Sequence, residues 1–82
     1  MNNTNKISYG TIIKNLRKSN KLSQTELGKL VGVSKSAISS YELETALPSI
    51  QTFIDICKVC HSKITITFDN HSYELEKLSR EF

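Results

Sequence analysis

Between Gln24 and Leu43 the chain reads QTELGKLVGVSKSAISSYEL, which is the most informative part of its sequence. Apolar residues recur there at helical spacing, and they are Leu27, Val31, Val33, Ile38 and Tyr41. Gly32 stands where a first short helix must end, a position that commonly needs a left-handed backbone. Gly28 leaves room for one helix to approach another closely. The segment therefore predicts two short helices that cross at a steep angle and are joined by a tight glycine turn.

The outer face of the second of these helices is short and polar. It carries Ser34, Lys35, Ser36, Ser39 and Ser40, and Ser34 is placed to cap the helix. Small polar or basic side chains of this kind can enter the major groove of DNA without steric obstruction. The pattern predicts a helix-turn-helix whose second helix faces DNA.

Helix signals also precede and follow this segment. Ser8 or Thr11 can cap a first helix that runs to about Asn20. Ser23 and Glu26 form an S-x-x-E capping box at the start of the next helix. A fourth helix starts at Pro48-Ser49, after a loop at 44–47. We expect its core-facing residues to be Ile50, Phe53, Ile54, Cys57 and Cys60, and those of the first helix to be Ile12, Ile13 and Leu16.

The pattern changes at residue 63, because ITITF at 64–68 alternates apolar and polar residues and predicts a strand. Two interpretations of the following residues stay open. With a turn at 69–72, the chain returns as a strand in which Tyr73 opposes Phe68 and Leu75 opposes Ile66. As a helix, the same region places Leu75, Leu78 and Phe82 on one stripe. The chain thus divides into a flexible arm at 1–7, a DNA-binding domain at 8–62, and a strand and tail at 63–82.

Charge is distributed unevenly along the 82 residues. The first 41 residues carry seven basic groups and one acidic group, whereas the remaining 41 carry four basic and seven acidic groups. The half that contains the predicted helix-turn-helix therefore has a charge of +6, which suits a polyanion, and the other half has a charge of −3. No signal peptide and no membrane-spanning run are apparent, so we expect a cytoplasmic protein without a membrane partner.

The segment LRKSNKLSQTELGKLVGVSKSAISSYE, followed by LPSIQTFIDICKVC, resembles the Cro and lambda-repressor-like (XRE) family of DNA-binding proteins. This resemblance covers residues from about 10 to 60. It implies a mainly α fold, namely a lambda-repressor-like helix-turn-helix bundle of four to five helices with a short C-terminal β-strand or hairpin. It also implies a sequence-specific transcriptional repressor that binds a double-stranded DNA operator.

The resemblance assigns roles to individual residues. Lys35, Ser36 and Ser40 match positions that reach base edges, and Gln24 matches one that contacts phosphate and braces the recognition helix. Arg17 matches a residue that forms an ion pair with the position of Glu42, and a direct phosphate contact by Arg17 is equally open. The loop at 44–47 lacks the basic residue that relatives carry there. The residues expected at DNA are Lys14, Arg17, Gln24, Ser34, Lys35, Ser36, Ser39 and Ser40.

A helix followed by a KITITF strand also resembles HipB-type antitoxins, in which such a strand pairs with its twofold mate. The resemblance implies a homodimer on a palindromic operator, with Ile64, Ile66 and Phe68 at the dimer interface. It further implies a toxin kinase bound by the C-terminal half. The alternatives are a monomeric hairpin, a phage or restriction-modification regulator without a toxin, and a module used mainly for protein interaction.

The sequence CKVCH at 57–61 matches the haem attachment motif C-x-x-C-H, but the export that haem attachment requires has no signal here. Cys57, Cys60, His61 and His71 could supply zinc ligands, although Cys60 and His61 diverge and His71 lies beyond the strand. We expect core packing for both thiols, a left-handed helix end at His61, and no metal, cofactor or catalytic site.

Overall fold

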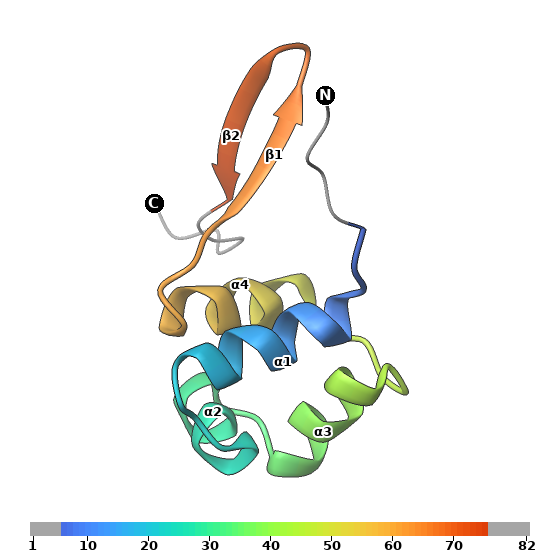
Figure 1. Ribbon diagram of the computed structural model, residues 1–82, viewed down its shortest axis with the longest axis vertical. Coiled ribbons are helices and arrows are strands. Elements are labelled where there is room, and N and C mark those ends of the chain that lie inside the picture. The colour runs from blue at the N-terminus through green and yellow to red at the C-terminus, as the bar shows by residue number, and fades with distance from the viewer. Residues whose placement is uncertain (1–5, 76–82) are drawn as a thin grey trace.

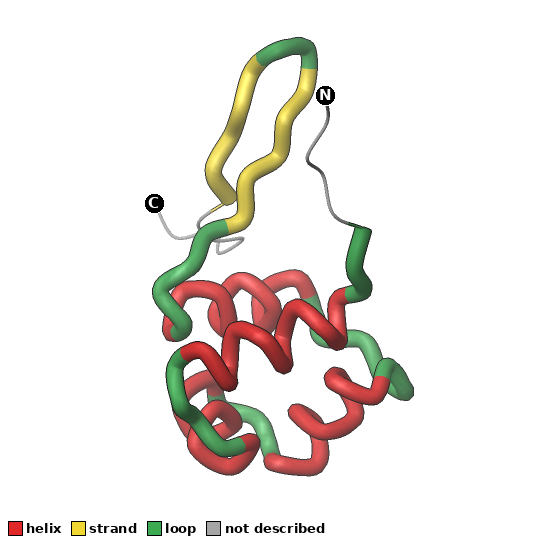
Figure 2. Tube along the Cα trace, viewed as in Figure 1, coloured by secondary structure: helices red, strands yellow, loops and turns green. Residues whose placement is uncertain are grey.

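The computed structural model describes residues 6–75, which form four helices and a two-stranded antiparallel sheet (Figures 1 and 2). The helices are α1 (Tyr9–Ser19), α2 (Gln24–Val31), α3 (Lys35–Leu43) and α4 (Ile50–Val59), and the strands are β1 (Ile64–Phe68) and β2 (His71–Leu75). This arrangement confirms the predicted fold class. The hairpin rises from the helical part, and α3 lies at the end of the molecule away from it (Figure 1). None of the helices within the described range is long and apolar enough to cross a membrane.

Serine side chains start three of the four helices. The hydroxyl of Ser23 accepts from the backbone N–H of Glu26, whose carboxylate accepts from the N–H of Ser23, so the predicted capping box is present. Ser34 and Ser49 cap α3 and α4 in the same way, through the third residue of each helix. Ser8 is the cap residue of α1, but its hydroxyl lies 3.2 Å from that of Thr11 and makes no capping bond to the backbone.

Each helix ends with a residue in the left-handed conformation, although only one of the four is glycine. These residues are Lys21, Gly32, Glu44 and His61. After α4, the N–H of His61 donates to Lys58 and that of Ser62 donates to Cys57, which closes a Schellman motif. The left-handed ends predicted at Gly32 and His61 are therefore confirmed.

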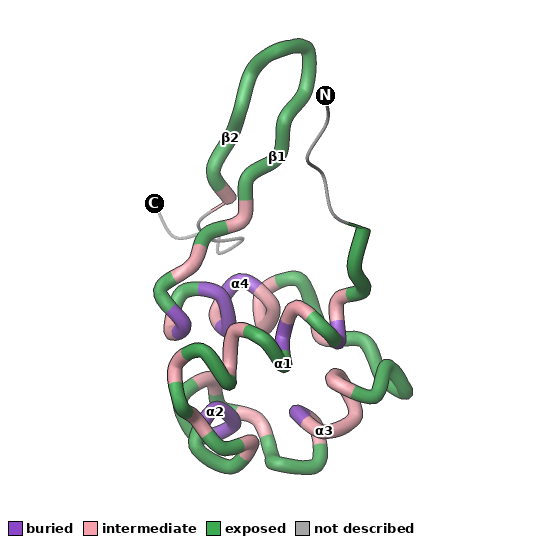
Figure 3. Tube along the Cα trace, viewed as in Figure 1, coloured by how far each residue is buried: buried purple, intermediate pink, exposed green. Residues whose placement is uncertain are grey.

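The core lies between the four helices (Figure 3). Its fully buried cluster consists of Ile13, Leu27, Ile38, Ile56 and Cys60, and Tyr9, Leu16, Leu22, Val31, Val33, Tyr41, Phe53 and Val59 pack around it. The expectation that Ile50 faces the core is wrong, because this side chain is 60% exposed in the first turn of α4. The residues of this segment that turn inward are at 53, 54, 56, 57 and 60, so the other four predictions hold and Ile56 is a core residue that the prediction left out.

Gly28 permits the close contact between α2 and the turn that follows it. A Cβ atom at this position would lie only 2.5 Å from the carbonyl oxygen of Val33. No larger residue fits without movement of the backbone, so Gly28 does permit a close approach, but to the turn before α3 rather than to another helix.

The hairpin turns over two residues rather than four. Asp69 and Asn70 both have positive φ, as a type I′ turn requires, and short polar residues tolerate that conformation. Tyr73 consequently opposes Ile66, and Leu75 opposes Ile64. The predicted register, in which Tyr73 opposed Phe68, is wrong by two residues because it assumed the longer turn.

Of the two interpretations that the sequence left open for these residues, the structure has the returning strand, since β2 pairs antiparallel with β1. The alternative interpretation placed three residues on one helical stripe. Of these, Leu75 belongs to β2, whereas Leu78 and Phe82 lie outside the described residues. The tail from residue 76 onward and arm residues 1–5 lie outside them too.

Candidate nucleic-acid interface

The polar face of α3 borders a shallow groove beside the start of α2. The groove has a volume of about 370 Å³ and is lined by Gln24, Lys35, Ser36, Ser39 and Ser40. Lys35 and Ser36 are exposed in the first turn of α3, and Ser39 and Ser40 are half-buried one turn later. Five of the eight residues predicted at DNA therefore lie together on one surface, which we call the α3 face.

The other three predicted residues lie around this surface in different settings. Ser34 is exposed, but its hydroxyl already accepts from the N–H of Ala37. Lys14 is exposed on α1, and its charge acts on the carboxylate of Glu42 at the end of α3. Arg17 lies behind the α3 face, with 11% of its side chain exposed.

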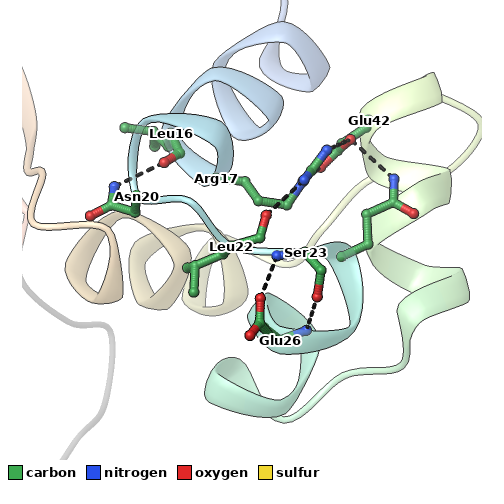
Figure 4. A network of polar contacts seen from close by, with 8 residues as sticks. Leu16, Arg17, Asn20, Leu22, Ser23, Glu26 and Glu42 are labelled. Carbon is green, nitrogen blue, oxygen red and sulfur yellow. Dashed lines mark hydrogen bonds and ion pairs between the residues drawn. The ribbon is translucent and has the colours of Figure 1, made fainter.

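A polar network centred on Glu42 joins α1, α2 and α3 (Figure 4). The guanidinium of Arg17 donates from Nε to Oε2 of Glu42 at 2.6 Å and from Nη2 to Oε1 at 3.1 Å. The third partner of Arg17 is the carbonyl oxygen of Leu22, at 2.8 Å from Nη1. The amide of Gln24 donates to Oε1 of Glu42 at 3.1 Å. The ion pair implied for Arg17 and Glu42 is thus present, and Gln24 braces α3 directly.

The network also sets the ionisation of its members. Partial burial of Glu42 opposes ionisation, but hydrogen bonds from Arg17 and Gln24 and nearby positive charge outweigh it, so the pKa of Glu42 lies below its ordinary value. The hydrogen bond to Glu42 raises the pKa of Arg17 above its already high ordinary value, against partial desolvation. Both groups are therefore charged at neutral pH, so a bidentate pair holds α3 against α1, and the hydrogen bond from Gln24 holds α3 against α2.

A second contact between α1 and the end of α3 was missed by the sequence analysis. The carboxylate of Glu44 accepts from the backbone N–H of Gly10 at 3.0 Å, and the hydroxyl of Tyr9 donates to the carbonyl of Ala46 at 2.9 Å. A Cβ at Gly10 would lie 2.6 Å from the carbonyl oxygen of Glu42. The loop at 44–47 therefore packs on the start of α1. In the sequence, the local signal of this contact was Gly10, a glycine in the first turn of a helix.

The two cysteines are free and buried in the packing of α4. Burial raises the pKa of the thiols of Cys57 and Cys60, so the reactive thiolate is disfavoured. Within residues 6–75, no group of three or more His, Cys, Asp or Glu side chains is arranged to hold a metal ion. None of the four candidate zinc ligands lines the groove of the α3 face; these are Cys57, Cys60, His61 and His71.

Comparison with known proteins decides the family. A helix-turn-helix family model matches residues 13–66, which is more than half of the chain. The chain belongs to this helix-turn-helix family. The match confirms the resemblance to XRE-type proteins, and it makes the chain a DNA-binding transcriptional regulator.

Solved structures agree with this assignment. The helix-turn-helix chain is 33% identical to the P22 c2 repressor in complex with the synthetic operator 9T, covering 70% of this chain and 86% of the repressor chain, with a TM-score of 0.65. The solution structure of the DNA-binding domain of the P22 c2 repressor gives 34% identity, coverage of 72% and 78%, and a TM-score of 0.66.

A complex of a HipB variant with a 20mer, O2, shares the fold at 24% identity, with coverage of 80% and 97% and a TM-score of 0.63. No curated protein sequence matches the chain.

Proposed function

We propose that this protein is a cytoplasmic transcriptional repressor that binds a palindromic operator as a homodimer, with α3 in the major groove. The observation that carries the proposal is the α3 face, where Lys35 and three serines border a groove next to Gln24. A related fold, the P22 c2 repressor at 33% identity, is described in complex with an operator. The first 41 residues, which include α1, α2 and most of α3, also carry the charge of +6 that a polyanionic partner favours.

The composition of the α3 face suggests how a sequence is read. Lys35 can donate to O6 and N7 of guanine, whereas the hydroxyls of Ser36 and Ser40 can donate or accept and discriminate weakly. We therefore propose one strong base contact in each half-site, with DNA shape and phosphate contacts supplying the remaining selectivity. Lys14, Gln24 and Ser39 are assigned to phosphate and groove-edge contacts, and Ser34 presents the start of α3. Arg17 contributes by holding Glu42.

The hairpin supports the dimer. Opposed pairs put Ile64, Ile66, Phe68, Tyr73 and Leu75 on one face together with His71, and Ile66, Phe68 and Tyr73 are 51%, 64% and 55% exposed. A two-stranded hairpin with an uncovered apolar face is marginal in water. The free edge of β1 contains neither charge nor proline to discourage pairing. We propose that β1 pairs antiparallel with β1 of a second copy, which places Ile64, Ile66 and Phe68 in the interface.

An antitoxin role is a second candidate. The acidic half of the chain, with a charge of −3, and the exposed hairpin suit a protein partner better than DNA. The likeness to HipB concerns the fold alone. Co-purification of the protein with the product of a neighbouring kinase-like gene would support this role, whereas a gene without such a neighbour would favour a free-standing regulator.

The proposed DNA contacts are testable by titration of an operator duplex, first identified by selection from random sequence. Lys35→Ala is expected to weaken operator binding by about 1–3 kcal/mol and to relax the preference at one base pair. Gln24→Ala is expected to weaken binding to all duplexes alike. Lys63→Ala, which removes the same charge next to the hairpin, is the control and should leave operator affinity nearly unchanged. Equal losses for Lys35→Ala on operator and on random duplex would contradict base readout.

A further inference from the structure

An apolar groove lies where the hairpin meets the helical part. Its volume is about 280 Å³, and its lining includes Tyr9, Leu47, Ile50 and Phe53 of the helical part together with Ile64 and Leu75 at the base of the hairpin. Among residues 6–75, no charged residue borders it. Leu47 and Ile50 are among the most exposed large apolar side chains that the structure describes, so no described part of the chain covers this apolar surface.

We propose that this groove is the socket for Phe68 of a second copy of the chain, and this inference rests on the homodimer proposed above. The register that pairs all five residues of two antiparallel β1 strands is centred on Ile66. In that register Ile64 stands directly opposite the partner's Phe68, with their Cβ atoms about 4.5–5.5 Å apart on the same face. Since Ile64 borders the groove, the partner's Phe68 is delivered to its rim.

The size and the chemistry of the groove fit that occupant. An apolar cavity of about 150 Å³ is known to hold a benzene ring, so a groove of about 280 Å³ accommodates a phenyl group. Within its own chain Phe68 is at the far end of the hairpin from the groove and remains 64% exposed. A partner's groove would bury it.

A stable dimer must bury more surface area than the exposed side chains of the hairpins supply. A stable interface buries about 800 Å² on each partner, whereas a fully buried aromatic side chain contributes about 150–250 Å². Ile66, Phe68 and Tyr73 are already about half covered, so hairpin contacts by themselves fall short. Adding Leu47, Ile50 and Phe53 extends the same apolar surface without a break, because Ile64 and Leu75 belong to both the hairpin and the groove.

A charge-complementation experiment tests the socket. Phe68→Glu and Ile50→Lys each put a charge at an exposed position, so both variants should fold, which circular dichroism verifies. Each variant alone is expected to weaken the dimer at least about tenfold, or 1.4 kcal/mol, in sedimentation equilibrium. An equimolar mixture is expected to regain dimers, because a mixed pair contains one intact socket and one socket that joins opposite charges. Thr67→Glu, on the polar face of β1, is the matched control and should dimerise normally.

The outcomes separate this inference from the function on which it rests. Normal dimers of Phe68→Glu, or no recovery on mixing, would overturn the socket while leaving a homodimeric repressor intact. A wild-type chain that stays monomeric both free and on operator DNA would overturn the homodimer itself, and the socket with it.

Discussion

At the scale of single residues, Glu42 and Glu44 show how one helix end is fastened at two points. Glu42 turns inward, with only 5% of its side chain exposed, and it accepts hydrogen bonds from Arg17 and Gln24. Glu44 lies two residues later, in the left-handed position, and accepts from the first turn of α1. Together they fix α3 against α1, and the position of α3 determines what the α3 face can reach.

Glu42→Gln is expected to lower the free energy of unfolding by about 2 kcal/mol, because it leaves the buried guanidinium of Arg17 without its counter-charge. Urea unfolding at neutral pH measures this. Glu74→Gln is the control, since its pair with Lys63 at 3.2 Å is exposed and worth less than about 1 kcal/mol. A loss no larger than that of the control would mean that the Glu42 network does not hold α3.

The same carboxylate should make stability depend on pH. The pKa of Glu42 is lower in the folded chain than its ordinary value of 4.5, so the unfolded chain takes up its proton first as pH falls. The stabilisation is therefore fully present above the ordinary value and is lost as pH falls through the folded pKa. We expect the difference in stability between wild type and Glu42→Gln to be largest at neutral pH and to shrink below pH 4.5. A difference that is constant down to acid pH would contradict this assignment.

At the scale of elements, the turn between α2 and α3 depends on two glycines for different reasons. Gly28→Ala would place a methyl group 2.5 Å from the backbone oxygen of Val33, so the turn must move. Gly32→Ala meets no atom within 4 Å but keeps a φ of +79°, which costs about 1–2 kcal/mol. We expect Gly28→Ala to reduce both stability and operator affinity, and Gly32→Ala to reduce mainly stability. Unfolding curves and operator titrations of the two variants separate these effects. Unchanged operator affinity in Gly28→Ala would show that the turn absorbs the methyl group elsewhere.

Elements were predictable wherever their signal is local. The caps at Ser23 and Ser34, the glycine turn and the alternation of β1 depend on residues within one helical turn or one strand, and these predictions hold, whereas Ser8 makes no capping bond. The prediction of the hairpin register was wrong because Asp69-Asn70 can form a two-residue turn as readily as part of a four-residue turn. The length of the turn shifts every opposed pair of the hairpin. Ile50 was misplaced because a helical stripe does not show which of its ends lies against the neighbouring helices.

The candidate site likewise contains residues that local sequence signals predicted and contacts that they did not. The four residues that α3 contributes to the α3 face could be predicted because they share one side of one helix, whereas Gln24 of α2 was predicted from the family resemblance. The contact between Glu44 and Gly10 could not, since it joins residues 34 positions apart and leaves no periodic trace in the sequence. The sequence also could not decide whether Arg17 braces α3 or contacts phosphate. The structure shows that its guanidinium makes three hydrogen bonds within the protein, two to Glu42 and one to Leu22.

At the scale of the whole molecule, the proposed function assigns the two ends of the protein to different partners, DNA at one end and a second copy of the chain at the other. The α3 face lies at one end and the apolar face of the hairpin projects at the other (Figure 1). In the proposed dimer the hairpins set the separation of the two α3 helices, which must match half-sites spaced by whole turns of DNA. Operator affinity should therefore depend on residues that do not contact DNA.

Replacing Ile66 tests that dependence, because this residue is at the centre of the proposed β1 pair. Ile66→Lys puts a charge into the apolar face of the hairpin, and burying two such charges side by side is strongly unfavourable. We expect sedimentation to show monomers, and operator affinity to fall steeply while binding to a single half-site is retained. Thr65→Lys adds the same charge to the polar face of the same strand and should spare the dimer, because neighbouring residues of a strand point to opposite faces. If Ile66→Lys still forms dimers that bind the operator normally, the helices make the interface, and the hairpin face must be covered by a different protein.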